Sequence, residues 1–172
     1  MTESKSKSDM IQMQVTGLTI DPFTNMPIVI MKDLEGNVAL PVWIGLIEAS
    51  AIATELEHIE LSRPMTHDLI KTILDELHVK VARIEIIDLM DNTFFATIHF
   101  KSKDKDLIVD CRPSDAIAVA LRSKAAIFVD RAVIEKSRQI ETNHQSEDQM
   151  KSQKWSEILE NLTPADFGKY KM

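Results

Sequence analysis

Alternating apolar and polar positions predict a sheet in the first part of the chain. Residues 11–15 follow the period-two pattern of a half-buried strand, and Gly17 is expected to end it. Two further apolar segments, 28–31 and 38–44, flank a turn-rich stretch and therefore predict a β-hairpin. Because proline cannot donate to a sheet ladder, Pro41 indicates an edge strand or a bulge.

The second half of the chain repeats this pattern. Residues 79–88, 93–100 and 107–111 are predicted to be three successive strands joined by short polar turns, which is a β-meander. One more strand is predicted at 126–129, followed by a short helix at 131–136. The expected fold is α+β, with a mixed β-sheet whose hairpin and meander pack against helices.

Helical periodicity marks three segments between these strands. A helix is predicted from Gly45 to about His58, and a second helix from about Thr66. The second helix carries an apolar stripe that we expect to be buried: Leu69, Ile70, Ile73, Leu74 and Leu77. The third segment, 116–121, is apolar on every side and predicts a central, buried helix.

The composition changes after about residue 136. A polar stretch is followed by Trp155, Ile158, Leu159 and Leu162, which have the spacing of an amphipathic helix. Such a helix needs a surface to cover its stripe, either on its own core or on a neighbouring subunit. We therefore expect a domain at 10–136 and, at 137–172, a polar linker with a C-terminal helical tail.

Charge and cysteine content limit the classes of function. The chain has 172 residues, a net charge of −7 and a single cysteine. The acidic balance disfavours nonspecific adhesion to nucleic acid. No apolar segment approaches the roughly 20 residues of a membrane span, and no leader pattern is found, so we expect a cytoplasmic protein without a membrane partner.

Two related elements carry the most informative chemistry. They are Arg63-Pro64-Met65-Thr66-His67-Asp68 and Arg112-Pro113-Ser114-Asp115. Each places a cation, a hydroxyl and a carboxylate at a predicted helix start, where free N–H groups and the helix dipole favour anions. The alternative is structural, since proline and hydroxyl residues commonly begin helices and the charged residues can pair with each other.

His67 is the strongest candidate for proton transfer, because it alone among the histidines stands beside both an arginine and an aspartate. Asp68 could orient it or hold a divalent ion, while Arg63 and Arg112 could grip a phosphate. Asp115 opens the apolar helix and needs a partner, for which Arg112 and Arg63 are the candidates. The competing interpretation is a network that locks two helices to the sheet.

Several motifs in the same order resemble those of the bifunctional nuclease domain family, in its bacterial form. They are Gly17-Leu18, Leu40-Pro41-Val42-Trp43-Ile44-Gly45 with Glu48-Ala49, and both arginine-proline elements. The resemblance covers about residues 10–136. It implies an α+β fold with a mixed sheet, a tendency to form dimers or larger assemblies, and an activity that plant members direct at both RNA and DNA.

The leading hypothesis is a nuclease that hydrolyses phosphodiester bonds in RNA or DNA. Its catalytic residues would be His67, Asp68 and Glu48. The residues expected to bind the substrate are Arg63, Thr66, Arg112, Ser114 and Asp115. Mg²⁺ or another divalent cation is a candidate cofactor. The alternative is a non-enzymatic homo-oligomeric module that binds a small anion or a protein partner. A basic groove leading to His67 favours the nuclease, and an enclosed salt bridge without a pocket favours the module.

Overall fold

A computed structural model describes residues 9–103 and 105–144. Within them, seven strands form one mixed sheet in the order β3-β2-β1-β7-β4-β5-β6. The strands are β1 (Met10–Ile20), β2 (Pro27–Asp33), β3 (Ala39–Trp43), β4 (Lys80–Met90), β5 (Thr93–Lys101), β6 (Leu107–Cys111) and β7 (Ala126–Asp130). Only the β4–β7 pair is parallel among these strands, so β7 joins the hairpin half to the meander half.

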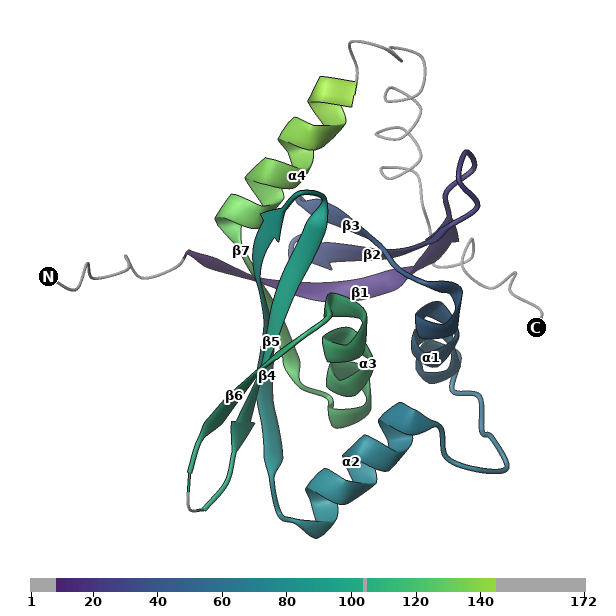
Figure 1. Ribbon diagram of the computed structural model, residues 1–172, viewed down its shortest axis with the longest axis vertical. Coiled ribbons are helices and arrows are strands. Elements are labelled where there is room, and N and C mark those ends of the chain that lie inside the picture. Colours follow the sequence, from purple (N-terminus) through teal and green to yellow (C-terminus); the bar gives the residue numbers. More distant parts are fainter. Residues whose placement is uncertain (1–8, 104, 145–172) are drawn as a thin grey trace, which may run out of the picture.

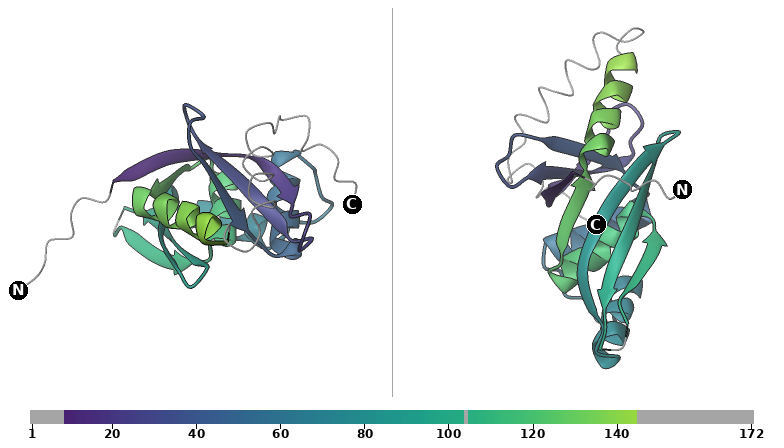
Figure 2. Two further views of the ribbon diagram at one scale, coloured as in Figure 1. Left: turned by 90° about the horizontal axis from the view of Figure 1, so that it is seen from above. Right: turned by 90° about the vertical axis from the view of Figure 1, so that its left-hand side faces the viewer.

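Four helices accompany the sheet in the described residues: α1 (Leu46–Leu56), α2 (Thr66–Glu76), α3 (Pro113–Ser123) and α4 (Arg131–His144). The strands β1–β3 run across Figure 1 while β4–β6 run along it, so the strongly twisted sheet curves around α3. Helix α3 packs against both α1 and α2. Helix α4 lies at the opposite end of the molecule from α2 in Figure 1 and in the right-hand view of Figure 2.

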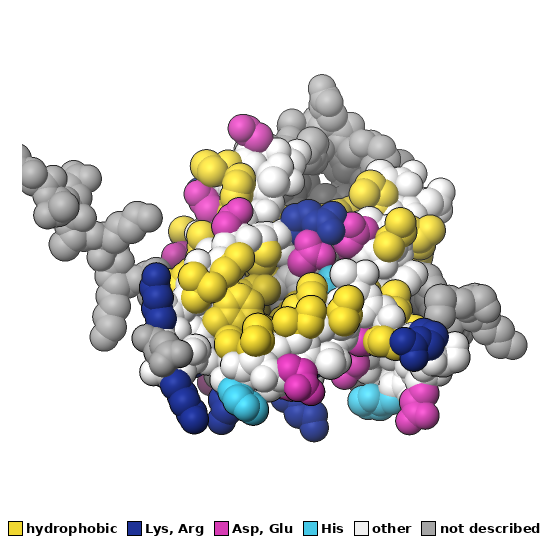
Figure 3. Space-filling view, turned by 60° about the horizontal axis from the view of Figure 1, so that its bottom comes forward, with side chains coloured by type: hydrophobic (Ala, Val, Ile, Leu, Met, Phe, Trp, Pro, Cys, Tyr) yellow, Lys and Arg dark blue, Asp and Glu magenta, His cyan; other side chains and the backbone are white. Residues whose placement is uncertain are grey.

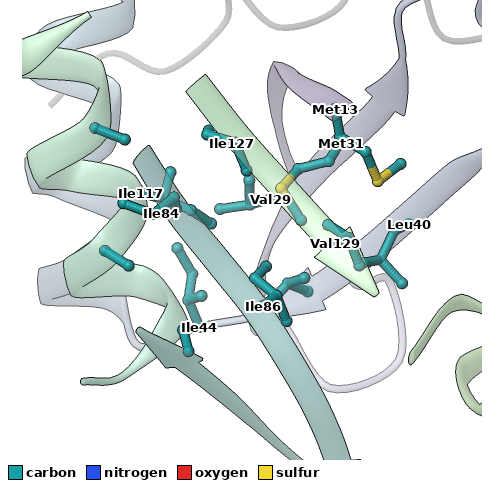
Figure 4. Packing of buried hydrophobic residues seen from close by; sticks show 14 of the residues in the cluster. Met13, Val29, Met31, Leu40, Ile44, Ile84, Ile86, Ile117, Ile127 and Val129 are labelled. Carbon is teal, nitrogen blue, oxygen red and sulfur yellow. The ribbon is translucent and has the colours of Figure 1, made fainter. Parts of the chain in front are cut away.

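The main core lies between the sheet and α3, where aliphatic side chains from both halves of the sheet meet (Figure 4). Ile84 and Ile86 from the meander half contribute to it together with Val29 and Met31 from the hairpin half, and all four are fully buried. Ile117 of α3 is also fully buried. The predicted α+β fold, the hairpin, the meander and the central apolar helix are confirmed.

Three boundaries differ from the prediction. Strand β1 does not end at Gly17 but continues to Ile20, because a bulge between Val15 and Gly17 lets the pairing with β2 resume in a shifted register. The short helix expected at 131–136 continues to His144. Pro41 lies on the edge strand β3, as predicted.

The burial predicted for the apolar stripe of α2 is wrong. None of the 11 residues of this helix is buried, and Leu69, Ile73 and Leu77 are 52, 48 and 66% exposed. The helix forms where the periodicity places it, but it contacts the rest of the molecule through α3 and leaves most of its apolar side uncovered. The tail predicted around Trp155 lies outside the described residues, and no described helix has the length and apolarity to span a membrane.

Candidate active site

The first turns of three helices converge on one pocket of about 400 Å³. Helix α1 supplies Ile47, Glu48 and Ala51, the start of α2 supplies Met65 through His67 together with Ile70, and the start of α3 supplies Arg112 and Asp115. Elements far apart in the sequence are brought together because α3 packs between α1 and α2. The two arginine-proline elements therefore meet at a single site.

Arg112 links the two carboxylates of this pocket. Its Nη1 donates to Glu48 Oε1 at 2.6 Å, and its Nε and Nη2 donate to Asp115 Oδ2 and Oδ1 at 2.7 and 3.2 Å. The pKa of Glu48 is lowered first by the hydrogen bond from its own backbone N–H and then by Arg112. Hydrogen bonds to Arg112 also lower the pKa of Asp115 against the effect of burial, and the two carboxylates raise the pKa of Arg112. The Arg112 side chain is nevertheless 65% exposed, and two of its five N–H donors are not used by these bonds.

Asp115 also contacts His67, whose Nε2 lies 3.1 Å from Asp115 Oδ1. Burial alone would raise the pKa of Asp115, but hydrogen bonds from Arg112 and His67 and the charge of Arg112 outweigh that effect and lower it. Asp115 is therefore ionised at neutral pH and accepts a hydrogen bond from Nε2 of the imidazole. In a neutral imidazole, that bond requires the tautomer whose Nδ1 carries a lone pair.

Gly45 explains the position of Glu48. An added Cβ at residue 45 would lie 2.2 Å from Glu48 Oε2 and 3.1 Å from its Cδ, so the carboxylate occupies the space that any larger residue would need. The backbone N–H of Glu48 donates to its own carboxylate and is the main cause of its lowered pKa, followed by Arg112. The missing side chain at Gly45 thus leaves the space in which the Glu48 carboxylate lies at the start of α1.

Asp68 lies outside the lining of this pocket. Its Oδ1 accepts a hydrogen bond from Arg122 Nε at 2.5 Å, and its Oδ2 accepts one from the backbone N–H of Met65 at 2.7 Å. The Arg122 side chain is only 4% exposed. Asp68 therefore caps α2 and ties it to α3, which is the structural role that was the alternative for the arginine-proline elements.

Of the other residues predicted to bind the substrate, some line the pocket and others do not. Thr66 lines the pocket at the start of α2. Arg63 is exposed in the loop before α2 and is not part of the lining. Ser114 is buried, at 7% exposure, and is not part of the lining either. Arg112, not Arg63, is the partner of Asp115.

The donor set does not fit a divalent cation in this arrangement. The guanidinium of Arg112 bridges Glu48 and Asp115 and so takes the place of a cation between the two carboxylates. Across residues 9–103 and 105–144, no group of three or more histidine, cysteine or acidic side chains is arranged to hold a metal ion. In this arrangement the space between the two carboxylates is therefore taken by Arg112 and not open to Mg²⁺.

Comparison with known proteins assigns this chain to a family. Residues 29–142 match the model of the bifunctional nuclease domain. The chain belongs to that family. An uncharacterized protein of Mycobacterium tuberculosis is 34% identical over 164 residues, which cover 91% of this chain and 97% of that protein.

Plant members of the bifunctional nuclease domain family are more distant. Bifunctional nuclease 2 of Arabidopsis thaliana is 25% identical over 107 residues, and bifunctional nuclease 1 of Oryza sativa subsp. japonica is 21% identical over 109 residues. These matches cover 60 and 61% of this chain but only 32 and 33% of the plant proteins. The similarity to the plant proteins thus involves about a third of their length.

Several residues of the site were not singled out from the sequence. Ile47 and Ile70 form an apolar rim, and Arg122 holds Asp68 from 54 residues away. Only Gly45 carried a local signal, because a glycine three residues before an acidic residue at a helix start leaves room for the carboxylate to fold back.

Proposed function

We propose that this protein is a phosphodiesterase acting on RNA or DNA, with its reaction centre in the pocket at the starts of α1, α2 and α3. The observation that carries the proposal is the connected chain of Glu48, Arg112, Asp115 and His67 along this pocket. An imidazole oriented by an ionised carboxylate, next to a partly unused guanidinium, is a combination suited to cleaving a phosphodiester. Membership of the family and the names of the plant relatives support the same reaction.

In this proposal His67 moves the proton. Asp115 holds Nε2, so Nδ1 is the nitrogen that takes a proton from the attacking oxygen or returns one to the leaving oxygen. Asp115 keeps the ring in this orientation and stabilises the imidazolium that forms. The imidazole is 13% exposed, so it is screened from bulk water but accessible from the pocket.

Arg112 and the start of α2 bind the phosphoryl group. The unused N–H donors of Arg112 stabilise the charge that develops on the phosphoryl oxygens, and the hydroxyl of Thr66 and the N-terminal amides of α2 supply further donors. Glu48 orients the guanidinium, so it acts as a positioning residue.

A second candidate function is favoured by the pocket lining, which includes the apolar side chains of Ile47 and Ile70 and a single basic residue, Arg112. With a neutral imidazole, Glu48, Asp115 and Arg112 give the pocket a net charge of −1. A non-enzymatic module that binds a small ligand with an apolar part is the function that fits this rim.

A nuclease assay with matched variants separates the two candidates. Labelled single-stranded RNA and DNA oligonucleotides are incubated with the wild type, His67→Asn and His78→Asn, all purified identically. His78 is exposed at the far end of α2 and outside the pocket, so it controls for the same chemical change and for contaminating nucleases. We expect His67→Asn to lose about 100-fold or more of the activity, within the range of general acid-base catalysis, and His78→Asn to retain it.

The activity should persist in EDTA, because Arg112 takes the cation's place between the carboxylates. Equal activity of His67→Asn and the wild type, or no activity in any sample, would reject the phosphodiesterase and leave the binding module.

A further inference from the structure

The pocket at the starts of α1, α2 and α3 offers a single nitrogen for proton transfer. Its ionisable lining residues are Glu48, His67, Arg112 and Asp115. Both carboxylates accept hydrogen bonds from Arg112, and their lowered pKa values leave them ionised at neutral pH, without a proton to donate. Asp115 holds Nε2 of His67, and no described residue makes a hydrogen bond to Nδ1 of the same ring.

The choice of nucleophile distinguishes RNA from DNA as a substrate of this pocket. Cleavage of DNA requires water, which is a poor nucleophile at neutral pH unless a metal ion lowers its pKa. The guanidinium of Arg112 lies between Glu48 and Asp115, where such an ion would need both carboxylates. A ribonucleotide brings its own nucleophile, because its 2′-hydroxyl stands next to the scissile phosphodiester. A well-oriented intramolecular attack of this kind has an effective concentration of about 10⁵ M or more, which solvent water does not reach.

We propose that the substrate of this pocket is single-stranded RNA, which is cleaved by attack of its own 2′-hydroxyl, and that DNA binds without being cut. This inference rests on the proposed function, since it assigns a substrate to the same pocket. Nδ1 of His67 accepts the proton of the 2′-hydroxyl while the bond between O2′ and phosphorus forms and the bond between phosphorus and O5′ breaks. The proton then passes from the imidazolium to the O5′ alkoxide. The products are a 2′,3′-cyclic phosphate and a 5′-hydroxyl, and no water is consumed.

The size and charge of the pocket favour an unpaired strand. Its volume of about 400 Å³ is at the small end of the range of ligand pockets, and the imidazole of His67 is 13% exposed. A duplex would have to unpair before its backbone reached this nitrogen, whereas an unpaired nucleotide can turn its phosphodiester inward. Figure 3 views the end of the molecule that carries α2, and on this face basic side chains are scattered among acidic and hydrophobic ones. This face thus lacks the continuous basic track that favours a duplex backbone.

Binding and cleavage depend on different parts of the substrate in this proposal. The unused N–H donors of Arg112 and the hydroxyl of Thr66 would contact phosphate oxygens, which RNA and DNA share. Ile47 and Ile70 supply apolar surface for a sugar or a base, again without a requirement for the 2′-hydroxyl. Removal of that hydroxyl should therefore abolish the reaction and leave the affinity nearly unchanged.

A DNA strand with one ribonucleotide, compared with the same strand made only of DNA, tests this expectation. The two strands differ by one oxygen atom at a known position. We expect cleavage only on the 3′ side of the ribonucleotide, about 1,000-fold or more faster than at any position of the all-DNA strand. Mass spectrometry of the first product should show a cyclic phosphate, which is lighter by one water molecule than a hydrolysed end. The all-DNA strand should inhibit this cleavage at about the concentration at which the mixed strand binds.

A contaminating ribonuclease that uses the 2′-hydroxyl would leave the same ends, so variants must assign the reaction to this pocket. His67→Asn should cleave the mixed strand about 100-fold or more slowly and still bind the all-DNA strand, as fluorescence anisotropy will measure. His78→Asn is the matched control, because His78 is exposed and outside the pocket, and it should retain both cleavage and binding.

The possible results separate this inference from the proposed function. Cleavage of the all-DNA strand at a similar rate would overturn the inference and leave the phosphodiesterase. A first RNA product with an ordinary phosphate that contains oxygen from ¹⁸O-labelled water would do the same. Cleavage that His67→Asn retains would place the reaction outside this pocket and overturn both. No cleavage of any strand would reject the proposed function, and the inference with it.

Discussion

Replacing Asp68 by asparagine is expected to lower the stability of the fold and to have no direct effect on catalysis. The substitution keeps the shape of the side chain but removes the charge that faces Arg122, whose side chain is 4% exposed. Arg122 Nε loses a charged acceptor at 2.5 Å, and its Nη2 already has no hydrogen-bond partner among the described residues. The single amide oxygen of asparagine cannot accept from both Arg122 Nε and the backbone N–H of Met65, so one of these two hydrogen bonds is lost. The buried guanidinium otherwise keeps one backbone acceptor, the carbonyl of Ala118.

The expected size of the effect follows from the burial of the pair. Breaking a fully buried ion pair from one side costs about 3–5 kcal/mol. Asp68 is 33% exposed, and solvent screening reduces the loss, so we expect a decrease of about 2–3 kcal/mol in the free energy of unfolding. For a domain of this size that corresponds to a melting temperature lower by roughly 8 °C.

Differential scanning calorimetry and urea unfolding at pH 7 measure this decrease. Asp75→Asn is the control on the same helix, because Asp75 is 61% exposed and pairs with Lys71 only at the surface, where such pairs contribute about 0–1 kcal/mol. The double variant Asp68→Asn/Arg122→Met should regain at least half of the lost stability, since it removes the uncompensated charge. If Asp68→Asn is as stable as Asp75→Asn but loses nuclease activity, Asp68 belongs to the chemistry and the structural assignment is wrong.

Three further predictions concern the pocket and its surroundings. Gly45→Ala should displace the Glu48 carboxylate from Arg112 and so lower phosphodiesterase activity about tenfold. The free energy of unfolding should change by no more than about 1 kcal/mol. Loss of folding, or unchanged activity, would refute the idea that Gly45 sets the position of Glu48. The pKa values of Glu48, Asp68 and Asp115 are lowered in the folded state, so the unfolded chain binds protons first as the pH falls. The stability that these three carboxylates contribute is therefore complete above about pH 4.5 and is lost at lower pH. Urea unfolding between pH 3 and 6 measures this loss, and the free energy of unfolding of Asp68→Asn should decrease less steeply with falling pH than that of the wild type. Burial, followed by the charges of Asp115 and Asp110, raises the pKa of Cys111 to about 11, so iodoacetamide at pH 8 should label it much more slowly in the native protein than in urea.

The local elements could be predicted from the sequence because their signals are local. The alternation in β4, β5 and β6 and the apolar character of α3 on every side gave the meander and the buried helix close to their observed bounds. The position of β7 had no such signal. Its pairing with β1 on one side and β4 on the other joins segments that are far apart in the chain, and periodicity does not say which strands are neighbours.

The sequence indicated some of the residues that line the pocket, but not which of them contact one another. His67 and Asp68 are adjacent in sequence, but successive residues of a helix point in directions about 100° apart. His67 therefore reaches Asp115 in the pocket, while Asp68 reaches Arg122 on α3. The partner of Glu48, Arg112, is 64 residues away and had no local signal at all. Residue types at a helix start narrow the chemistry, and packing decides which of them share a site.

The error about the burial of α2 has a physical origin that also concerns the site. A period of 3.6 residues shows that one side of a helix avoids water, but it does not show whether the cover comes from the same chain. In this fold the start of α2 is held against α3 by the contacts of His67 with Asp115 and of Asp68 with Arg122, and no residue of α2 is buried. The polar residues that form the site thus set the orientation of α2 and expose its stripe. The contacts of His67 and Asp68 and the exposure of the apolar stripe therefore follow from the same packing of α2 on α3.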